Sequence, residues 1–187
     1  NRTVEYTNIM TLGNSCDFGD TTVDINRLAG MGADATKATF YGGYDPSAAS
    51  NGIEYIVFST KGNSASWGDL TTSNPHSRGA GNSTRGLRHD ANAPAADTVD
   101  YITWASIGNA VDFGDMIVSR SQCAATQSTT RVVFQGGATG PTELATIDYF
   151  TIASTGDASD FGDITAGAQG SAQGDSSSTR SVFGGGY

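Results

Sequence analysis

The chain is a fourfold tandem repeat, and this feature constrains its fold more than any other. A tetrad ending in aromatic-Gly-Asp occurs four times, as Asp17-Phe18-Gly19-Asp20, Ser66-Trp67-Gly68-Asp69, Asp112-Phe113-Gly114-Asp115 and Asp160-Phe161-Gly162-Asp163. A tyrosine lies eleven residues before every tetrad, at Tyr6, Tyr55, Tyr101 and Tyr149. A Thr followed by Lys or Arg comes fifteen or sixteen residues after each tetrad. The period of about 48 residues falls in the range of propeller blades.

Composition supports one β-rich domain. The chain has 187 residues, of which 37% are hydrophobic and only 16% are charged, and it contains 25 glycines. That is enough apolar material for a single core, with the turn-forming residues of an antiparallel β protein. We therefore expect one all-β domain over residues 1–187, with repeats at about 1–48, 49–95, 96–143 and 144–187.

The third repeat shows how the strands of one blade are expected to lie. Apolar and polar residues alternate over residues 99–106, which predicts a strand with two different faces. Gly108-Asn109 predicts a tight hairpin turn after it, because both residues tolerate positive φ. A second strand carries Phe113, a third runs from residue 116 to about 122, and a fourth covers residues 130–134. Four strands in one period predict one antiparallel propeller blade.

The repeat also resembles a known family. Its glycine motif follows an apolar strand at Phe40-Tyr41-Gly42-Gly43, Phe134-Gln135-Gly136-Gly137 and Phe183-Gly184-Gly185-Gly186. These motifs, together with the alternating strand, the tetrad aromatic and a later Arg at Arg27, Arg78 and Arg120, resemble the kelch repeat of β-propellers over the whole chain. More narrowly, the motif Gly-Asn-x-x-Asp-Phe-Gly-Asp, with a later Ser-Thr-Arg and Gly-Gly-Gly, resembles kelch-like repeats in structural or tail-associated proteins of marine phages. The resemblance implies about four four-stranded kelch-like blades and a place in a virion.

The two ends of the chain fall inside blades. Counted from the Arg-containing strand, the first two strands, around residues 4–10 and 17–22, lack inner partners, and the last two, around residues 164–170 and 179–185, lack outer partners. An unpaired strand edge is an aggregation liability unless something covers it. We expect the two half blades to pair and close a ring of four. The alternative is pairing with another chain, which gives a larger ring or an open filament.

The tetrad aspartates raise the question of catalysis or calcium binding. Because these carboxylates recur at the same place in every repeat, ring symmetry distributes them instead of bringing them together. We expect one Asp of a tetrad to cap a turn and the other to face water or an Arg. We expect the Thr-Lys and Thr-Arg cations to pair with repeat aspartates across strands. The glycine pairs are not followed by Gly-Lys-Ser/Thr, so they predict positive φ at strand ends and not a phosphate loop.

The second repeat breaks the pattern. It has Arg88-His89-Asp90 where the first, third and fourth repeats have an aromatic and glycines, and His76, Arg78 and Arg85 lie nearby in the sequence. A polar departure from a repeat can mark a site, because a site needs groups that the scaffold does not. These six residues are therefore a candidate binding patch for an anionic group, such as a sugar carboxylate or an acidic protein face. The alternative is sequence drift in a tolerant blade.

Enzymatic function has little support in the sequence. The chain has two histidines, no Gly-x-Ser-x-Gly elbow and no Cys/His cluster, so we expect no catalytic residues, no metal and no cofactor. For the two cysteines, Cys16 and Cys123, the alternatives are a disulfide or two small buried side chains. A net charge of −9 argues against nucleic acid. No run of apolar residues is long enough for a membrane span.

Two classes of function remain. The first is a non-enzymatic structural or adhesion module in a virion (tail, fibre or decoration) or in an extracellular filament, with other virion or filament proteins, or copies of itself, as partners. The second is a glycan-binding, lectin-like propeller that recognises a cell surface, in which equivalent sites give avidity. The repeated Tyr and Phe lie in strand patterns, which favours core packing over sugar stacking.

Overall fold

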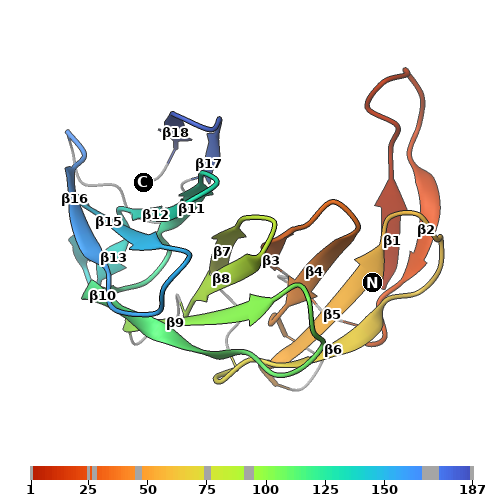
Figure 1. Ribbon diagram of the computed structural model, residues 1–187, viewed down its shortest axis with the longest axis horizontal. Coiled ribbons are helices and arrows are strands. Elements are labelled where there is room, and N and C mark those ends of the chain that lie inside the picture. Colours follow the sequence, from red (N-terminus) through yellow and green to blue (C-terminus); the bar gives the residue numbers. More distant parts are fainter. Residues whose placement is uncertain are drawn as a thin grey trace.

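The structure is a computed structural model that describes residues 2–24, 26, 29–44, 48–73, 77–90, 95–165 and 173–185. All regular secondary structure in these ranges is β, as the sequence predicts. Three four-stranded antiparallel sheets follow one another along an open arc, and a two-stranded sheet stands at each end of it (Figure 1).

Each four-stranded sheet joins the last two strands of one repeat to the first two of the next. The first sheet has the order β3 (Ala29–Ala33), β4 (Lys37–Tyr41), β5 (Gly52–Val57) and β6 (Ala65–Asp69). The second has β7 (Arg78–Gly81), β8 (Arg85–His89), β9 (Ala96–Thr103) and β10 (Val111–Arg120). The third has β11 (Ala124–Gln127), β12 (Arg131–Gln135), β15 (Thr146–Thr151) and β16 (Ser159–Asp163), and a small hairpin, β13 (Ala138–Thr139) with β14 (Thr142–Glu143), interrupts it.

The sheets at the two ends have only two strands, which confirms that the end sheets are half the size of the interior ones. The strand predicted around residues 164–170 is not at residues 164–165, and residues 166–170 lie outside the described part of the chain. The N-terminal pair is β1 (Thr3–Tyr6) with β2 (Cys16–Asp20), and the C-terminal pair is β17 (Gln173–Ser176) with β18 (Ser181–Gly184). The expected ring closure is not found. The strands of the described residues do not form a closed propeller, because β1 and β18 belong to separate sheets at opposite ends of the arc (Figure 1).

Two local predictions were wrong. The segment predicted as a third strand, residues 116–122, instead continues β10 as far as Arg120, and the third strand is β11. The chain turns between them at Gln122, which has a φ of 61°. The Gly-Asn dipeptides do not form two-residue hairpins either, since seven residues, 58–64, connect β5 to β6.

The glycine motif adopts the predicted backbone conformation. Gly42, Gly43, Gly136, Gly137 and Gly185 all have positive φ, between 63° and 95°. A Cβ at Gly137 would lie 2.5 Å from the Ser121 carbonyl oxygen, so only glycine fits there. Gly186 and Arg27 lie outside the described residues.

The core lies between the sheets of the arc and is divided into two clusters. The first strands of successive sheets, β3, β7, β11 and β17, lie side by side. Two apolar clusters fill the space between the sheets, one around Trp67 and Trp104 and one around Phe113, Phe134 and Phe150. The position of each sheet is therefore set by its contacts with the next.

Candidate functional site

The most regular feature of the molecule is a contact between neighbouring sheets, which we call the intersheet joint. It consists of the tetrad on the last strand of one sheet and the Gly-Asn or Gly-Asp turn of the next sheet. In the joint between the second and third sheets, the Gly156 N–H donates to the Phe113 carbonyl at 2.7 Å, and the Ala158 N–H donates to the Asp115 carbonyl at 2.8 Å. The Asp115 N–H in turn donates to Oδ1 of Asp157 at 3.1 Å.

The other two joints repeat this pattern. Between the first and second sheets, the Asp69 N–H donates to Asn109 Oδ1 at 3.0 Å, and the Asp69 carbonyl accepts from Ala110 at 2.8 Å. Between the N-terminal pair and the first sheet, the Asp20 N–H donates to Asn63 Oδ1 at 3.0 Å, and the Asp20 carbonyl accepts from Ser64 at 2.9 Å. Two bonds, at the N–H and at the carbonyl of the second tetrad Asp, therefore occur in all three joints, and the bond to the aromatic carbonyl recurs from Gly62 to Phe18 at 2.8 Å.

The tetrad glycine makes this approach possible. A Cβ at Gly19, Gly68 or Gly114 would lie 2.3 to 2.5 Å from the carbonyl carbon or oxygen of the facing turn glycine. The three tetrad glycines also have φ between 146° and 156°, at the edge of the region that glycine favours. The close backbone approach gives the physical reason for the Gly in the tetrad and the small residues in the facing turn.

The aromatic residue of the tetrad is buried beneath the joint in the first three repeats. Phe18, Trp67 and Phe113 are 8%, 2% and 2% exposed. Trp67 meets Trp104 of the next sheet edge to face at 6.0 Å, and Phe113 meets Phe150 at 5.7 Å. The repeat tyrosines pack edge to face on the tetrad aromatics of their own sheets. These rings thus have the packing role that the sequence predicts.

The tetrad aspartates have exposed side chains and lie in strands. Asp17, Asp20, Asp69, Asp112, Asp115, Asp160 and Asp163 are distributed over β2, β6, β10 and β16. The predicted capping role is found in the fourth tetrad, where Oδ1 of Asp160 accepts the Gly162 N–H at 3.0 Å. The joint itself uses the backbone of the second Asp and the side chain of the facing turn residue. Over the described part of the chain, no group of three or more His, Cys, Asp or Glu side chains is placed to hold a metal ion.

A second set of carboxylates, not singled out in the sequence, is buried beside the joints. Glu54, Asp100 and Asp148 precede the repeat tyrosines, and each accepts a backbone N–H from the segment that follows the previous tetrad. Arg120 donates to Asp148 at 2.7 Å with both side chains fully buried. Burial raises the pKa of Asp148, although Arg120 opposes the shift. The acidic residue in every Ile/Val-acid-Tyr triplet was the signal for this role.

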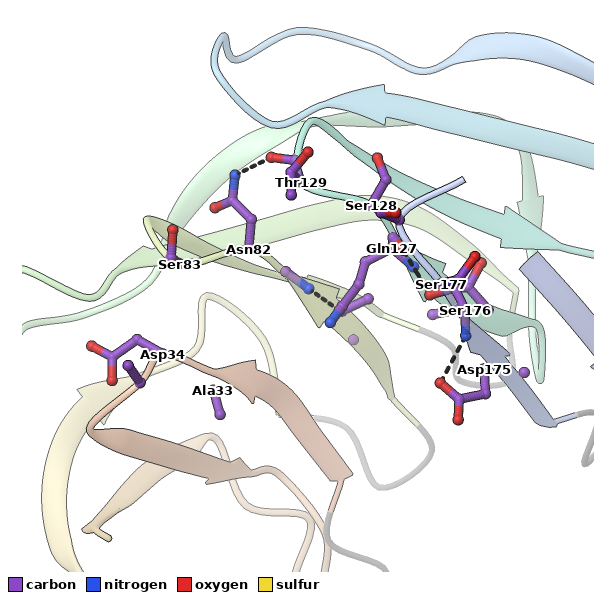
Figure 2. Close-up of a pocket in the computed structure, with 18 residues that line it drawn as sticks. Ala33, Asp34, Asn82, Ser83, Gln127, Ser128, Thr129, Asp175, Ser176 and Ser177 are labelled. Atoms are coloured by element: carbon purple, nitrogen blue, oxygen red, sulfur yellow. Dashed lines mark hydrogen bonds between the residues drawn. The ribbon is translucent and has the colours of Figure 1, made fainter. Parts of the chain in front are cut away.

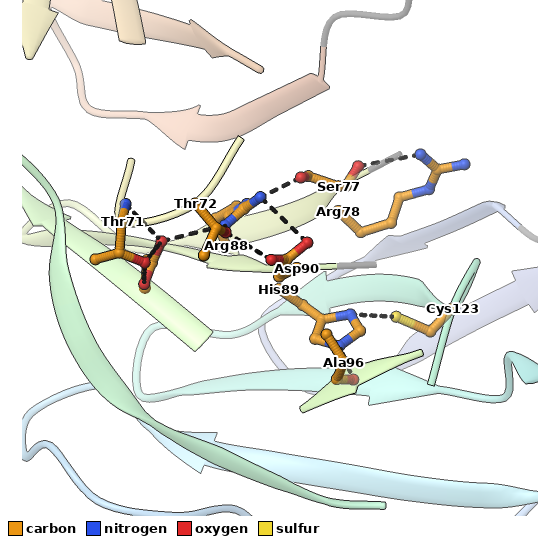
Figure 3. A network of polar contacts seen from close by, with 10 residues as sticks. Thr71, Thr72, Ser77, Arg78, Arg88, His89, Asp90, Ala96 and Cys123 are labelled. Carbon is orange, nitrogen blue, oxygen red and sulfur yellow. Dashed lines mark hydrogen bonds and ion pairs between the residues drawn. The ribbon is translucent and has the colours of Figure 1, made fainter. Parts of the chain in front are cut away.

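Arg88 and Asp90, from the candidate binding patch, belong to the same network of buried charges (Figure 3). Arg88 is fully buried and contacts Asp100 at 3.1 Å and Asp90 at 3.5 Å. Its Nε also donates to Ser77 Oγ at 2.9 Å. Two carboxylates therefore already face this guanidinium, and an external anion would have to displace one of them.

Of the other two described arginines of the predicted patch, Arg85 packs elsewhere, and Arg78 meets Arg88 only through Ser77. Arg85 lies with its guanidinium 4.9 Å from the centre of the Tyr101 ring, and Arg131 stacks on Tyr149 in the same way at 4.3 Å. In these two repeats the cation is thus a partner of the repeat Tyr, where we had expected a pair with a repeat aspartate. Lys37 of the first repeat lies 3.9 Å from Asp34. Arg78 is half-buried and donates to the Ser77 carbonyl at 3.1 Å. His76 lies outside the described residues.

His89 forms a buried pair with a cysteine. Its Nε2 lies 3.0 Å from the Ala96 carbonyl, which only accepts, so Nε2 carries the proton and Nδ1 accepts from the Cys123 thiol at 3.3 Å (Figure 3). Burial, with Arg120 and Arg88 nearby, lowers the pKa of His89 to about 4. Burial also raises the pKa of the Cys123 thiol to about 11. Both groups are therefore neutral at pH 7, which is the opposite of an activated nucleophile.

The two cysteines do not form a disulfide. Both are free, and Cys16 is exposed on β2, so it does not have the small buried role that we had considered for it.

A polar cavity of about 570 Å³ opens where the ends of β3, β7, β11 and β17 meet (Figure 2). Asn82 donates to the Thr129 carbonyl at 2.7 Å, and Gln127 accepts from the Gly81 N–H at 2.6 Å. Much of the amide lining is thus engaged within the chain. A second hollow, of about 600 Å³, lies between the third sheet and β18 and is lined in part by Phe161, Arg131 and Phe183.

One half of the joint is open at each end of the arc. Gly162, in the fourth tetrad, has no atom within 4 Å of the place of a Cβ, whereas Gly19, Gly68 and Gly114 lie against a facing turn. In the first Gly-Asn turn, Ser15 is exposed, whereas Ser64 and Ala110, at the same position of later turns, are buried. Phe161 is 55% exposed, whereas the aromatics of the other three tetrads are buried. The molecule therefore presents a tetrad without a turn at one end and a turn without a tetrad at the other.

Neither a known protein family nor any curated protein matches this sequence. Within the described ranges, there is no helix of the length and apolarity that crossing a bilayer requires.

Proposed function

We propose that this chain is a non-enzymatic structural or adhesion module built from kelch-like propeller blades, and that it acts through protein-protein contacts at its two ends. The observation that carries the proposal is the open half joint at each end. The joint occurs three times inside the chain, so this arrangement of residues can hold two sheets together. Its open halves, at Gly162 and at the exposed turn from Gly13 to Ser15, are surfaces of the same kind.

The unpaired strand edges support the same function. β1 and β18 are each bonded to one neighbour, whereas the equivalent strands β5 and β4 are paired on both sides. An open edge offers backbone groups to a strand from another molecule. A virion or an extracellular filament is the setting that we infer, since both are built from repeated contacts between rigid subunits, and the partners are other structural proteins or further copies of the chain.

Glycan binding is the alternative function, and the observed packing gives it less support. Sugar binding commonly uses exposed aromatic faces, but Trp67 and Phe113 are buried in joints and the Tyr101 ring lies under Arg85. Arg88 is likewise held by internal carboxylates. Phe161 is exposed beside the second hollow, so this hollow and the polar cavity in Figure 2 are the remaining places for a sugar.

The test is the mass of the chain in solution as a function of concentration, by sedimentation or light scattering, together with a glycan array. We expect species heavier than the monomer that dissociate on dilution, and no glycan signal. A monomer at every concentration would count against association through the ends. Glycan binding that is lost on substitution of Gln127, in the polar cavity, would favour the alternative.

A further inference from the structure

We propose that the two open ends are complementary to each other, so that the C-terminal end of one copy binds the N-terminal end of a second copy, head to tail. This inference rests on the proposed function and specifies its partner as the chain itself. The contact would be a fourth intersheet joint and a fourth four-stranded sheet, each made from two molecules.

The C-terminal end lacks a cover that the interior positions have. Val182 on β18 is 65% exposed, whereas the residues at the same repeat position, Thr39, Leu87 and Val133, are at most 9% exposed. Phe161 on β16 shows the same contrast with its counterparts. Both side chains lie where another sheet covers their equivalents, so the missing element is a further sheet of the same kind.

The N-terminal end presents the matching element. Ile9 is 94% exposed, whereas Phe58, Trp104 and Ile152, at the same position of later repeats, are 49%, 4% and 0% exposed. In the interior, Trp104 packs against the tetrad aromatic of the preceding sheet. Ile9 of one copy is therefore the natural contact for Phe161 of another, and the turn of Gly13 and Asn14 is the natural contact for Gly162 and Asp163.

The strand register of the contact follows from the interior sheets. In these sheets the residue equivalent to Val182 pairs with the repeat Tyr, as in Leu87 with Tyr101 and Val133 with Tyr149. In the contact, Val182 would therefore stand opposite Tyr6 of the second copy, with β18 antiparallel to β1. Arg180 would then lie near this Tyr6, whose ring also has Lys61 of its own chain at 4.5 Å.

A second copy fits these ends better than the chain's own other end does. The N-terminal and C-terminal pairs stand at opposite ends of the arc (Figure 1). In all three joints the carbonyl of the second tetrad Asp accepts a backbone N–H from the facing turn, which holds the orientation of one sheet to the next. Self-closure would require these joints to change, whereas a second copy can bind with the joints as they are. Because the two surfaces differ, the contact is heterologous, and it produces a larger ring or a filament.

The experiment uses two variants that each block one end. Ile9→Asp places a charge on the N-terminal end, and Val182→Asp places one on the C-terminal end. Both side chains are exposed, so neither substitution should unfold the chain. The control is Leu12→Asp, because Leu12 is also fully exposed in the same loop, but its counterpart Ile107 stays 58% exposed in an interior sheet. Masses are measured at moderate salt, which screens the repulsion between copies that carry a charge of −9.

We expect each end-blocked variant alone to be a monomer, and an equimolar mixture of the two to form a complex of twice the chain mass that grows no further. Leu12→Asp should associate as the wild type does. If the wild type associates but the mixture forms no dimer, or if one blocked variant still dimerises by itself, the head-to-tail contact is refuted while association through the chain's surfaces survives. If the wild type is a monomer throughout, both proposals fail.

Discussion

The intersheet joint predicts a large difference between two substitutions that look alike in the sequence. Gly114→Ala and Gly162→Ala change the same repeat position, and both residues have positive φ, of 146° and 129°. A Cβ at residue 114 would lie 2.4 Å from the carbonyl group of Gly156, whereas a Cβ at residue 162 would meet nothing within 4 Å. Gly114→Ala should therefore open a joint, and Gly162→Ala should not.

The magnitude follows from two contributions. An unfavourable φ costs on the order of 1–3 kcal/mol, and this cost applies to both variants. Opening the joint also gives up the hydrogen bonds of Gly156, Ala158 and Asp115 to their partners. At a net contribution of about 1 kcal/mol for each bond, Gly114→Ala should lose about 3 kcal/mol more than Gly162→Ala. This is a large part of the stability of an ordinary domain.

The assay is urea unfolding of both variants in the Val182→Asp background, which keeps the chain monomeric if the ends associate. Hydrogen exchange provides a local measurement, because the Gly156 and Ala158 amides should lose protection in Gly114→Ala and keep it in Gly162→Ala. Equal losses of unfolding free energy, with unchanged protection at Gly156, would refute the joint as a source of stability.

Three further predictions concern other groups. The folded-state pKa of His89 is lowered to about 4, so between this value and its ordinary pKa of about 6.5 the unfolded state binds more protons, and acidification over this window should cost on the order of 3 kcal/mol; urea unfolding at several pH values should show this slope, and a His89→Gln variant that keeps the whole slope would contradict it. Cys16 is exposed and Cys123 is buried with a raised pKa, so a thiol reagent should modify Cys16 quickly and Cys123 only on unfolding, as mass spectrometry of the labelled peptides can determine; equal rates in the native protein would argue against the buried pair. Asn109→Ala removes the acceptor of an intersheet bond and should lower the unfolding free energy by about 1 kcal/mol, whereas Asn14→Ala, at the open turn, should leave the monomer unchanged; the same denaturation assay compares them, and identical stabilities would be inconsistent with the joint.

The sequence alone was sufficient to identify the repeat, the all-β class and the division of the end sheets. These features depend on local patterns: alternation of apolar residues, glycines at positive φ, and the fixed spacing from Tyr6 to Phe18 and its later copies. Such patterns report which face of a strand is buried, and a repeat multiplies the signal.

The tertiary structure decided what the repeated residues contact. The Gly-Asn dipeptide by itself predicts a hairpin turn. In the structure, the side-chain oxygens of Asn63 and Asn109 accept backbone N–H groups of the preceding sheet. The sequence around Asp100, in Val99-Asp100-Tyr101, predicts a solvent-exposed position on a strand, but the side chain lies buried against Arg88. Both roles depend on groups that lie far away in the sequence, and their energies arise only once two sheets meet. The open arc has the same cause, because its curvature is set by the joints and not by any one repeat.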